Sequence, residues 1–421
     1  MKKLYFSLFC TFITICCVGQ DSLNVMFYNL YRFPTSPPAN REFLLKAIVD
    51  SIKPDLLMAC EIVSETGANR IINSSFSNLK DSFARAEFHY SESAVADPLQ
   101  QMVFYNTRKL ILIKERVLKT SVRDINHYTF ILNLEHLPND SVFVEVFVTH
   151  LKSSEGPTNR ALRLSMVDTF VNALAQIPHN HYVLFAGDFN FYQAANEPAY
   201  QKILDKTNPI IMIDPIDMPG NWHDNAAFSA IHTQATRTSA AGFGLGGATG
   251  GMDDRFDFIT ISENSKNNPA FSYVEDSYAA YGNNGNCFDK SIHDTSCTGI
   301  YSFSIREKLH NMSDHVPIIM KFKTNYSFNI APTKIQNVGT EIDIQLLNGN
   351  IIEDNLQISI GKGLIFPSTI LVYNILGKLI NKTPISPYNK KTNIDMSAYA
   401  PGMYFLKMDH AFSPTLKFIK K

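Results

Sequence analysis

The sequence predicts an α/β sandwich in which helices cover sheets, followed by a small C-terminal β-sandwich domain. Up to about residue 325, apolar strand-like runs alternate with helix-like segments. Beyond that point the helical period stops, and short β-rich runs alternate with turns. A chain of 421 residues, 45% of them hydrophobic, is long enough for more than one domain and can bury a large core.

The N-terminus predicts a segment that is removed before folding. Lys2 and Lys3 precede an apolar run over residues 4–18, and Gly19 and Gln20 follow it. These are the three parts of a secretory signal peptide, which we place at residues 1–20. A membrane anchor is the alternative, but the run is shorter than the ~20 apolar residues that span a bilayer.

Residues 23–60 predict a strand, a helix and a second strand. Leu23, Val25 and Phe27 alternate with other residues, as in a half-buried strand. Asn40 can cap a helix with one apolar face over residues 44–52. The apolar run at 55–60 predicts a strand buried on both faces.

The remaining elements follow the same logic. An amphipathic helix is expected over residues 158–177, because its apolar side chains recur at helical spacing. Further buried strands are expected at 143–149, 182–187, 256–261 and 316–322. The glycine-rich stretch Gly242 to Gly251 lacks a following helix, which indicates a loop rather than a phosphate-cradling motif.

Three cysteines remain after residue 20. Cys287 and Cys297 bracket a short polar loop, and an oxidising compartment would let them pair, although two unlinked thiols are the alternative. Cys60 lies in an apolar run and is expected to be a buried free thiol.

Polar side chains stand at the ends of the predicted strands. Helix capping explains any one of them, but not the whole series in this order. Functional sites on sheet scaffolds are assembled from such positions. The series comprises Asn29, Glu61, His150, Asp188, Asn190, Asp257, Asp314 and His315.

These residues belong to recognisable strings. The strings are Asn29-Leu30, Cys60-Glu61, Thr149-His150-Leu151-Lys152, Gly187-Asp188-Phe189-Asn190, Arg255-Phe256-Asp257-Phe258-Ile259 and Ser313-Asp314-His315. Residues 21–325 thereby resemble the endonuclease/exonuclease/phosphatase superfamily. The resemblance implies a DNase I-like catalytic domain, a four-layer α/β/β/α sandwich with two sheets face to face and helices outside.

The resemblance implies a metal centre. Glu61 would be the principal ligand, with Asn29 and Asp314 nearby or bonded through water. Hard oxygen ligands favour Mg²⁺, or Mn²⁺, with Ca²⁺ as an alternative in a structural role. The ion would act as a Lewis acid on a phosphoryl oxygen.

The resemblance also implies catalytic roles. Asp188 and Asn190 would orient the attacking water and the phosphate. His315, held by Asp257, would act as general base or phosphate stabiliser. His150 would stabilise the pentavalent oxygens or protonate the leaving group. Whether Asp188 or His315 takes the proton is left open.

One position departs from the DNase I pattern. That branch has a glutamate behind the histidine that corresponds to His150, just before a strand matching residues 102–105. Gln100 or Gln101 stands there instead. A glutamine can orient His150 but cannot stabilise its charged form, which weakens the role of His150 as a general acid.

Four further residues are candidates for substrate binding. Lys152 follows His150 closely, and Arg123 suits bidentate phosphate contact, with a surface ion pair to Asp124 as the alternative. His232 and Arg255 flank an unusually polar stretch that we expect to wall the substrate groove. The single tryptophan nearby, Trp222, could stack on a base or pack against the sandwich.

The C-terminal segment resembles a type A sorting domain of type IX secretion. The runs Val372 to Lys378, Pro401 to Leu406 and Lys417 to Lys421 carry this resemblance. It places a linker at residues 326–345 and the sorting domain at 346–421, and it implies the export machinery as a partner. A carbohydrate-binding or adhesive β-sandwich is the alternative.

Together these features predict a secreted, divalent-metal-dependent phosphodiesterase, exported through periplasm and outer membrane to the surface or the medium. A nuclease acting on extracellular DNA or RNA is the first hypothesis. Charge is balanced, with 38 basic and 39 acidic residues, so phosphate recognition must be local. The alternatives are a phosphatase or phospholipase-like hydrolase on a smaller phosphoester, and a non-catalytic surface binding protein.

Overall fold

The computed structural model describes most of the chain after residue 20. The described ranges are 21–79, 82–91, 99–135, 141–239, 246–329, 343–361, 368–385, 391–409 and 414–421. The predicted signal peptide, and most of the predicted linker, lie outside these residues.

Two mixed sheets form the first part of the molecule. One has the strand order β11-β13-β1-β2-β4-β3, with β12 also paired to β13; the other has the order β5-β6-β7-β8-β10-β9. The first comprises β1 (Asp21–Phe33), β2 (Leu56–Ile62), β3 (Phe83–Arg85), β4 (Gln100–Asn106), β11 (Ser272–Tyr273), β12 (Ala279–Ala280) and β13 (Ile318–Thr324). The second comprises β5 (Leu110–Leu118), β6 (Ile125–Leu132), β7 (Phe143–His150), β8 (Tyr182–Asp188), β9 (Met212–Ile213) and β10 (Asp257–Ser262).

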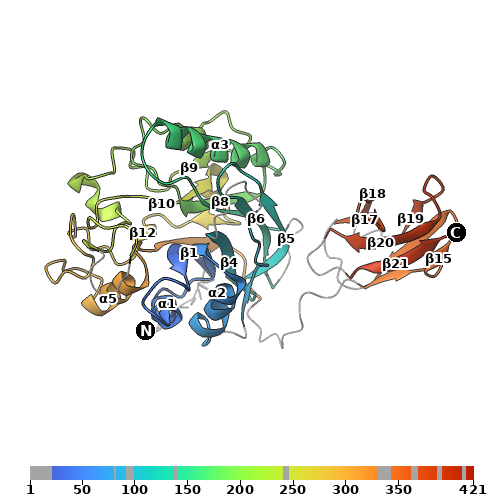
Figure 1. Cartoon of the computed structure of the whole chain (residues 1–421), viewed down its shortest axis with the longest axis horizontal. Helices are drawn as coiled ribbons and strands as arrows, with labels where there is room; N and C mark the ends of the chain where they lie inside the picture. Colours follow the sequence, from blue (N-terminus) through green and yellow to red (C-terminus); the bar gives the residue numbers. More distant parts are fainter. Residues whose placement is uncertain are drawn as a thin grey trace, which may run out of the picture.

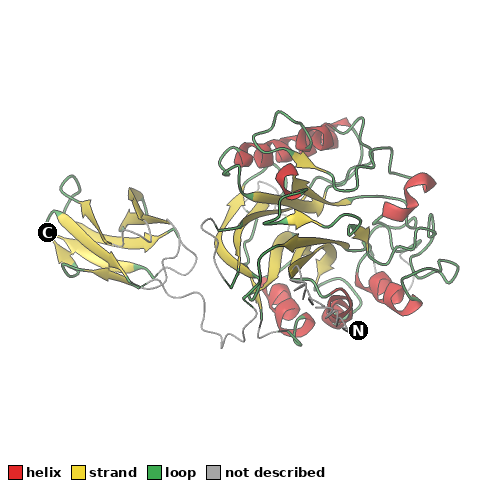
Figure 2. Cartoon of the chain, turned by 180° about the vertical axis from the view of Figure 1, so that it is seen from behind, coloured by secondary structure: helices red, strands yellow, loops and turns green. Residues whose placement is uncertain are grey.

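Helices cover the outer face of each sheet (Figures 1 and 2). The first sheet packs against α1 (Arg41–Ile52), α2 (Glu65–Arg70) and α5 (Phe303–Met312). The second packs against α3 (Pro157–Leu174) and α4 (Pro198–Ile203). Short helical turns lie at Ile71–Ser75, Ala226–Ile231 and Glu263–Ser265.

Three apolar clusters confirm the predicted four layers. One lies between the sheets and draws on strands of both, for example Phe27, Met58, Val146 and Leu184. The other two lie between a sheet and its helices. Successive side chains of a strand point to opposite faces of the sheet, and here both faces are covered. The strands are therefore continuously apolar in sequence.

The helices and strands lie where the apolar patterns placed them, with small shifts of their ends. The helix expected over 158–177 runs from Pro157 to Leu174, for example. Asn40 precedes α1 as predicted, but its side chain makes no capping hydrogen bond, because the residue adopts a left-handed conformation with φ of 62°.

The C-terminal part is a separate β domain with its own core (Figure 1). One sheet has the order β14 (Ile344–Leu346)-β16 (Asn355–Ile360)-β19 (Lys391–Asp395). The other has the order β15 (Ile351–Ile352)-β21 (Leu416–Lys420)-β20 (Gly402–Met408)-β17 (Ser368–Asn374)-β18 (Leu379–Ile385). This agrees with the predicted small β-sandwich.

Cysteine bonding resolves the alternatives left by the sequence. Cys287 and Cys297 form a disulfide, and Cys60 is a buried free thiol. Within the described part of the chain, no helix has the length and apolar character needed to cross a membrane.

Candidate active site

Strand topology brings the predicted polar residues to one edge of the sandwich. β1 is parallel to β2, and β7 is parallel to β8, so the carboxyl ends within each pair coincide. The register sets Asn29 opposite Cys60, beside Glu61, and sets His150 opposite Asp188. The antiparallel strand β10 begins at Asp257, also opposite Asp188.

Asn29 lies at the centre of the resulting cluster. Its Nδ2 donates to Glu61 Oε1 at 3.1 Å and to Asp188 Oδ2 at 3.0 Å. His150 completes the group, with Nε2 3.5 Å from Asp188 Oδ2 and Nδ1 3.9 Å from Glu61 Oε1. All four side chains are buried. Residues from both sheets therefore meet in one site.

His315 joins the cluster with a carboxylate behind it. Asp257 Oδ2 lies 2.7 Å from Nδ1 of His315, and Asp188 Oδ2 lies 3.6 Å from Nε2. Burial opposes protonation of His315, but Asp257, and then Asp314 and Asp188, raise its pKa well above the ordinary value. The dyad fixes the ring and makes Nε2 a strong base.

His150 has the opposite character. Burial, and then the charge of Arg123, lower its pKa well below the usual value. Its Nδ1 has no hydrogen-bond partner among the described residues. Gln101 Nε2 instead donates to the backbone carbonyl of Asp124. Gln101 is therefore bonded away from His150, toward the segment before β6.

The site carries an excess of buried negative charge. Burial, and then Asp314, raise the pKa of Glu61, and burial raises the pKa of Asp188. Donor atoms of Glu61, His150 and Asp188 all lie within 4.8 Å of one another. Carboxylates gathered in this way fit a divalent cation, which would offset the cost of burying their charges.

Local backbone geometry holds the two main carboxylates. Glu61 has a φ of 60°, and its Oε2 accepts from the backbone N–H of Arg32 at 3.0 Å. Asn190, with a φ of 53°, donates from Nδ2 to Asp188 Oδ1 at 2.8 Å. Both strand ends thus turn sharply at the site, and Asn190 lies where the sequence predicted it.

Asp314 is held by a loop whose role the sequence did not reveal. Its Oδ2 accepts from the backbone N–H of Ala248 at 2.7 Å. A Cβ on Gly247 would lie 2.6 Å from the same oxygen, so only glycine leaves room. Gln234 was also missed: its Nε2 lies 2.6 Å from His315 Nε2. The sequence showed the glycine-rich and polar stretches, but it did not show that they fold back onto Asp314 and His315.

Two predicted substrate-binding residues lie beside His150. Arg123 Nη1 donates to the backbone carbonyl of Leu151 at 3.1 Å. Lys152 is partly exposed, and its ammonium donates to Ser153 O at 2.8 Å. Burial, and then Arg123, lower the pKa of Lys152. The two cations are therefore near each other at the rim of the site.

The other two residues predicted to bind substrate, Arg255 and His232, are buried and already bonded to other groups. Arg255 forms a bidentate ion pair with Asp214, with N–O distances of 2.8 and 2.9 Å. Its guanidinium also stacks against the rings of Trp222 and Phe258. His232 is buried between the backbone carbonyls of Trp222 and Met252. Trp222 is itself fully buried, so packing against the sandwich is its role.

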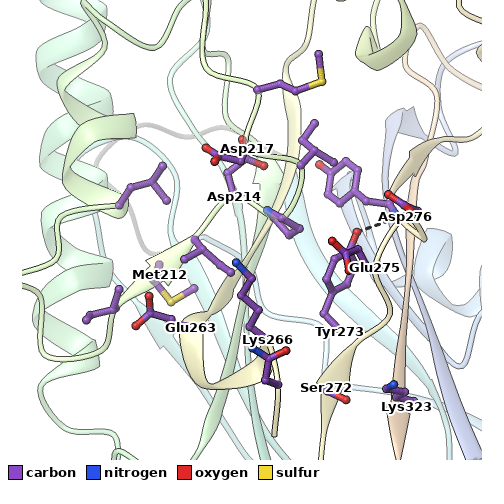
Figure 3. Close-up of a pocket in the computed structure, with 18 of the residues that line it drawn as sticks. Met212, Asp214, Asp217, Glu263, Lys266, Ser272, Tyr273, Glu275, Asp276 and Lys323 are labelled. Atoms are coloured by element: carbon purple, nitrogen blue, oxygen red, sulfur yellow. Dashed lines mark hydrogen bonds between the residues drawn. The ribbon is translucent and has the colours of Figure 1, made fainter.

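A separate cavity of about 1120 Å³ lies away from this cluster (Figure 3). Its wall combines acidic residues such as Asp217 and Glu275 with Lys266 and Lys323. Asp214, also in the wall, is already paired with Arg255. No residue of the cluster around Asn29 lines this cavity.

Comparison with known proteins identifies the tail. Residues 350–421 match the family model of the secretion system C-terminal sorting domain. The C-terminal domain is a sorting domain. This confirms the prediction for the tail, and it indicates export. A search of curated proteins gave no match.

Solved structures similar to this chain are distant in sequence. The human Nocturnin catalytic domain is 14% identical, covers 73% of this chain and 98% of its own, and gives a TM-score of 0.44. D. rerio TDP2 complexed with single-strand DNA product is 13% identical, with 72% and 99% coverage and a TM-score of 0.45. An endonuclease/exonuclease/phosphatase from Beutenbergia cavernae DSM 12333 is 14% identical, with 94% and 99% coverage and a TM-score of 0.43.

Proposed function

We propose that this chain is an exported, divalent-metal-dependent phosphodiesterase that hydrolyses DNA or RNA outside the cell. The observation that carries the proposal is the convergence of two units on Asp188. One is the carboxylate cluster around Asn29, and the other is the His315–Asp257 dyad. A phosphodiester needs both, because its negative charge must be neutralised and its attacking water must lose a proton.

Mg²⁺ is the proposed ion, held by Glu61, Asp188 and the nearby Asp314, and it would supply Lewis-acid polarisation of a phosphoryl oxygen. Asn29 orients the carboxylates of Glu61 and Asp188 by donating to both.

Proton transfer falls to the histidines. His315 accepts a proton from water at Nε2, while Nδ1 donates to Asp257 and the carboxylate stabilises the imidazolium. Burial and the charge of Arg123 lower the pKa of His150, which favours a hydrogen bond from this ring to a phosphoryl oxygen over transfer of a full proton. Asn190 keeps Asp188 in place.

Nucleic acid is the proposed substrate because two cations extend the site beyond the reacting phosphate. Arg123 and Lys152 lie beside His150 and suit a neighbouring backbone phosphate. A smaller phosphoester is the second candidate, since these two are few for a nuclease groove.

The test compares substrates with the purified chain. Plasmid DNA, RNA and a phosphomonoester are incubated with Mg²⁺ or with EDTA. We expect Mg²⁺-dependent nicking of plasmid or cleavage of RNA, with losses of at least about 100-fold in kcat for Glu61→Gln and His315→Ala. Turnover of the phosphomonoester alone would favour the second candidate, and cleavage in EDTA would contradict the metal mechanism.

Matched controls exclude general damage. Glu307 is exposed on α5, and His179 is exposed after α3. Glu307→Gln and His179→Ala should therefore retain the activity of the unmodified chain. An equal loss in these controls would show that the effect of the site variants is not local.

For the tail, we propose type IX export, with delivery to the surface or the medium. The match at residues 350–421 supports it. Removal of that segment should retain the protein in the periplasm, which fractionation would detect. Normal delivery without it would contradict the proposal.

A further inference from the structure

A second histidine-carboxylate cluster lies outside the candidate active site. It comprises Glu87, His89 and Glu115, and it shares no residue with the catalytic cluster. Glu87 and His89 follow β3, an edge strand of the first sheet. Glu115 lies on β5, an edge strand of the second.

The alternation of side chains after β3 places Glu87 and His89 on the same side of the chain. In the segment Glu87-Phe88-His89 the middle residue is buried in the core under the first sheet, while its two neighbours are more exposed. Glu115 is anchored to the same segment, because its Oε2 accepts from the backbone N–H of Glu87 at 3.1 Å. Ligand atoms of the three side chains all lie within 4.8 Å of one another.

One donor of this cluster is left unsatisfied. His89 Nε2 is buried, and it has no hydrogen-bond partner among the residues that the structure describes. A buried ring nitrogen without a partner loses the hydrogen bond that it would make with water. A bound cation would take up its lone pair.

The charge balance also leaves room for a cation. Arg85, the nearby guanidinium, is already paired with Glu65 at 2.8 Å. The cluster therefore concentrates negative charge at a partly desolvated position.

We propose that Glu87, His89 and Glu115 form a binding site for a divalent transition-metal ion, with zinc as its occupant, that fastens the edges of the two sheets together. An imidazole with two carboxylates is a donor set that zinc accepts, and Mg²⁺ prefers oxygen alone. Three protein ligands leave one position for water. The ion would connect the segment after β3 to β5.

Zinc binding is measured in the Glu61→Gln background, which weakens the other histidine-carboxylate cluster. Metal-free protein is titrated with zinc against a chromophoric chelator, and with Co²⁺ by visible absorption. We expect one equivalent of zinc, a Co²⁺ band typical of a nitrogen- and oxygen-bound ion, and a melting temperature higher by a few degrees at about 100-fold excess over Kd.

Adding His89→Ala should abolish this equivalent, the Co²⁺ band and the rise in melting temperature. Adding the near-isosteric Glu115→Gln should weaken binding at least about tenfold with the fold preserved. His179→Ala, an exposed histidine elsewhere, should change nothing. The proposal is wrong if the Glu61→Gln chain binds no zinc, or if His89→Ala and His179→Ala bind it equally.

Discussion

Asp257 makes its side-chain hydrogen bond to the site through His315. Its Oδ2 contacts Nδ1 of that ring, and the residue is fully buried. Asp257→Asn keeps the shape and removes the charge, so we expect kcat to fall roughly 100- to 10,000-fold with little change in KM. In a His315→Ala background the same substitution should have almost no further effect, because the two residues work as one unit. Additive losses in steady-state kinetics would contradict this dependence.

Gly247 is required for the position of Asp314. Its φ is +83°, and an added Cβ would lie 2.6 Å from Asp314 Oδ2. Gly247→Ala should displace this carboxylate and lower kcat/KM at least about tenfold. Gly349 is the matched control: its φ is +79°, and an added Cβ would meet nothing within 4 Å. Gly349→Ala has the same backbone strain, of about 1 kcal/mol, and should leave the kinetics unchanged. Equal activity of both variants would refute the steric argument.

At this scale, the sequence indicates the position of residues that follow apolar strands more directly than that of residues in loops. Glu61, His150 and Asp188 were identifiable because each ends a buried strand whose register carries it to the site. Arg255 and His232 have the same polar character, yet tertiary partners bury them. The period of apolar residues along the chain does not indicate where a loop folds back onto the sheets.

At the scale of elements, β7 is joined to its neighbours by a buried polar network. Glu145 accepts from His127 on β6, from Thr129 on β6 and from His181, each at 2.7 Å. Arg116 Nε donates to His127 Nδ1, so the proton of this neutral ring lies on Nε2, facing Glu145. The network links β5, β6, β7 and the start of β8 through side chains.

The same network predicts how stability depends on pH. Burial alone would raise the pKa of Glu145, but hydrogen bonds from His127 and His181 lower it to about 2. A lowered carboxyl pKa stabilises the fold above its unfolded value near 4.5, and this contribution is lost as pH falls toward 2. Glu145→Gln should lower the free energy of unfolding by roughly 1.5–3 kcal/mol at pH 7. The further loss of stability on acidification should then be less steep than in the unmodified chain.

Urea unfolding at several pH values would measure both effects. Glu135→Gln, at an exposed carboxylate, is the control and should follow the unmodified chain. If the stability of Glu145→Gln fell with pH as steeply as that of the unmodified chain, Glu145 would not be the cause of the pH dependence.

Element boundaries were predictable because both faces of the strands are buried, which leaves continuous apolar runs. The order of the strands within each sheet was not, since pairing depends on contacts between distant segments. The pairing of β1 with β13 joins the first strand of the domain to its last. The family resemblance supplied the four layers, but neither it nor the apolar periods specified this pairing.

At the scale of the whole molecule, the two domains have separate apolar cores. A cross-domain ion pair, Lys114 with Asp409 at 3.3 Å, is half exposed on both sides and worth little. Deleting residues 350–421 should therefore leave kcat and KM on plasmid or RNA unchanged. Circular dichroism melting should retain the transition of the catalytic domain. A loss of activity without unfolding would show that the tail contributes to the site.

Asn29 and His315 are 286 positions apart, and they meet through the pairing of β1 with β13. A ribosome must therefore complete nearly the whole catalytic domain before any working centre can assemble. Incomplete translation products lack β13, and with it the histidine. Under the proposed function, unfinished chains therefore cannot attack the messenger RNA that encodes them.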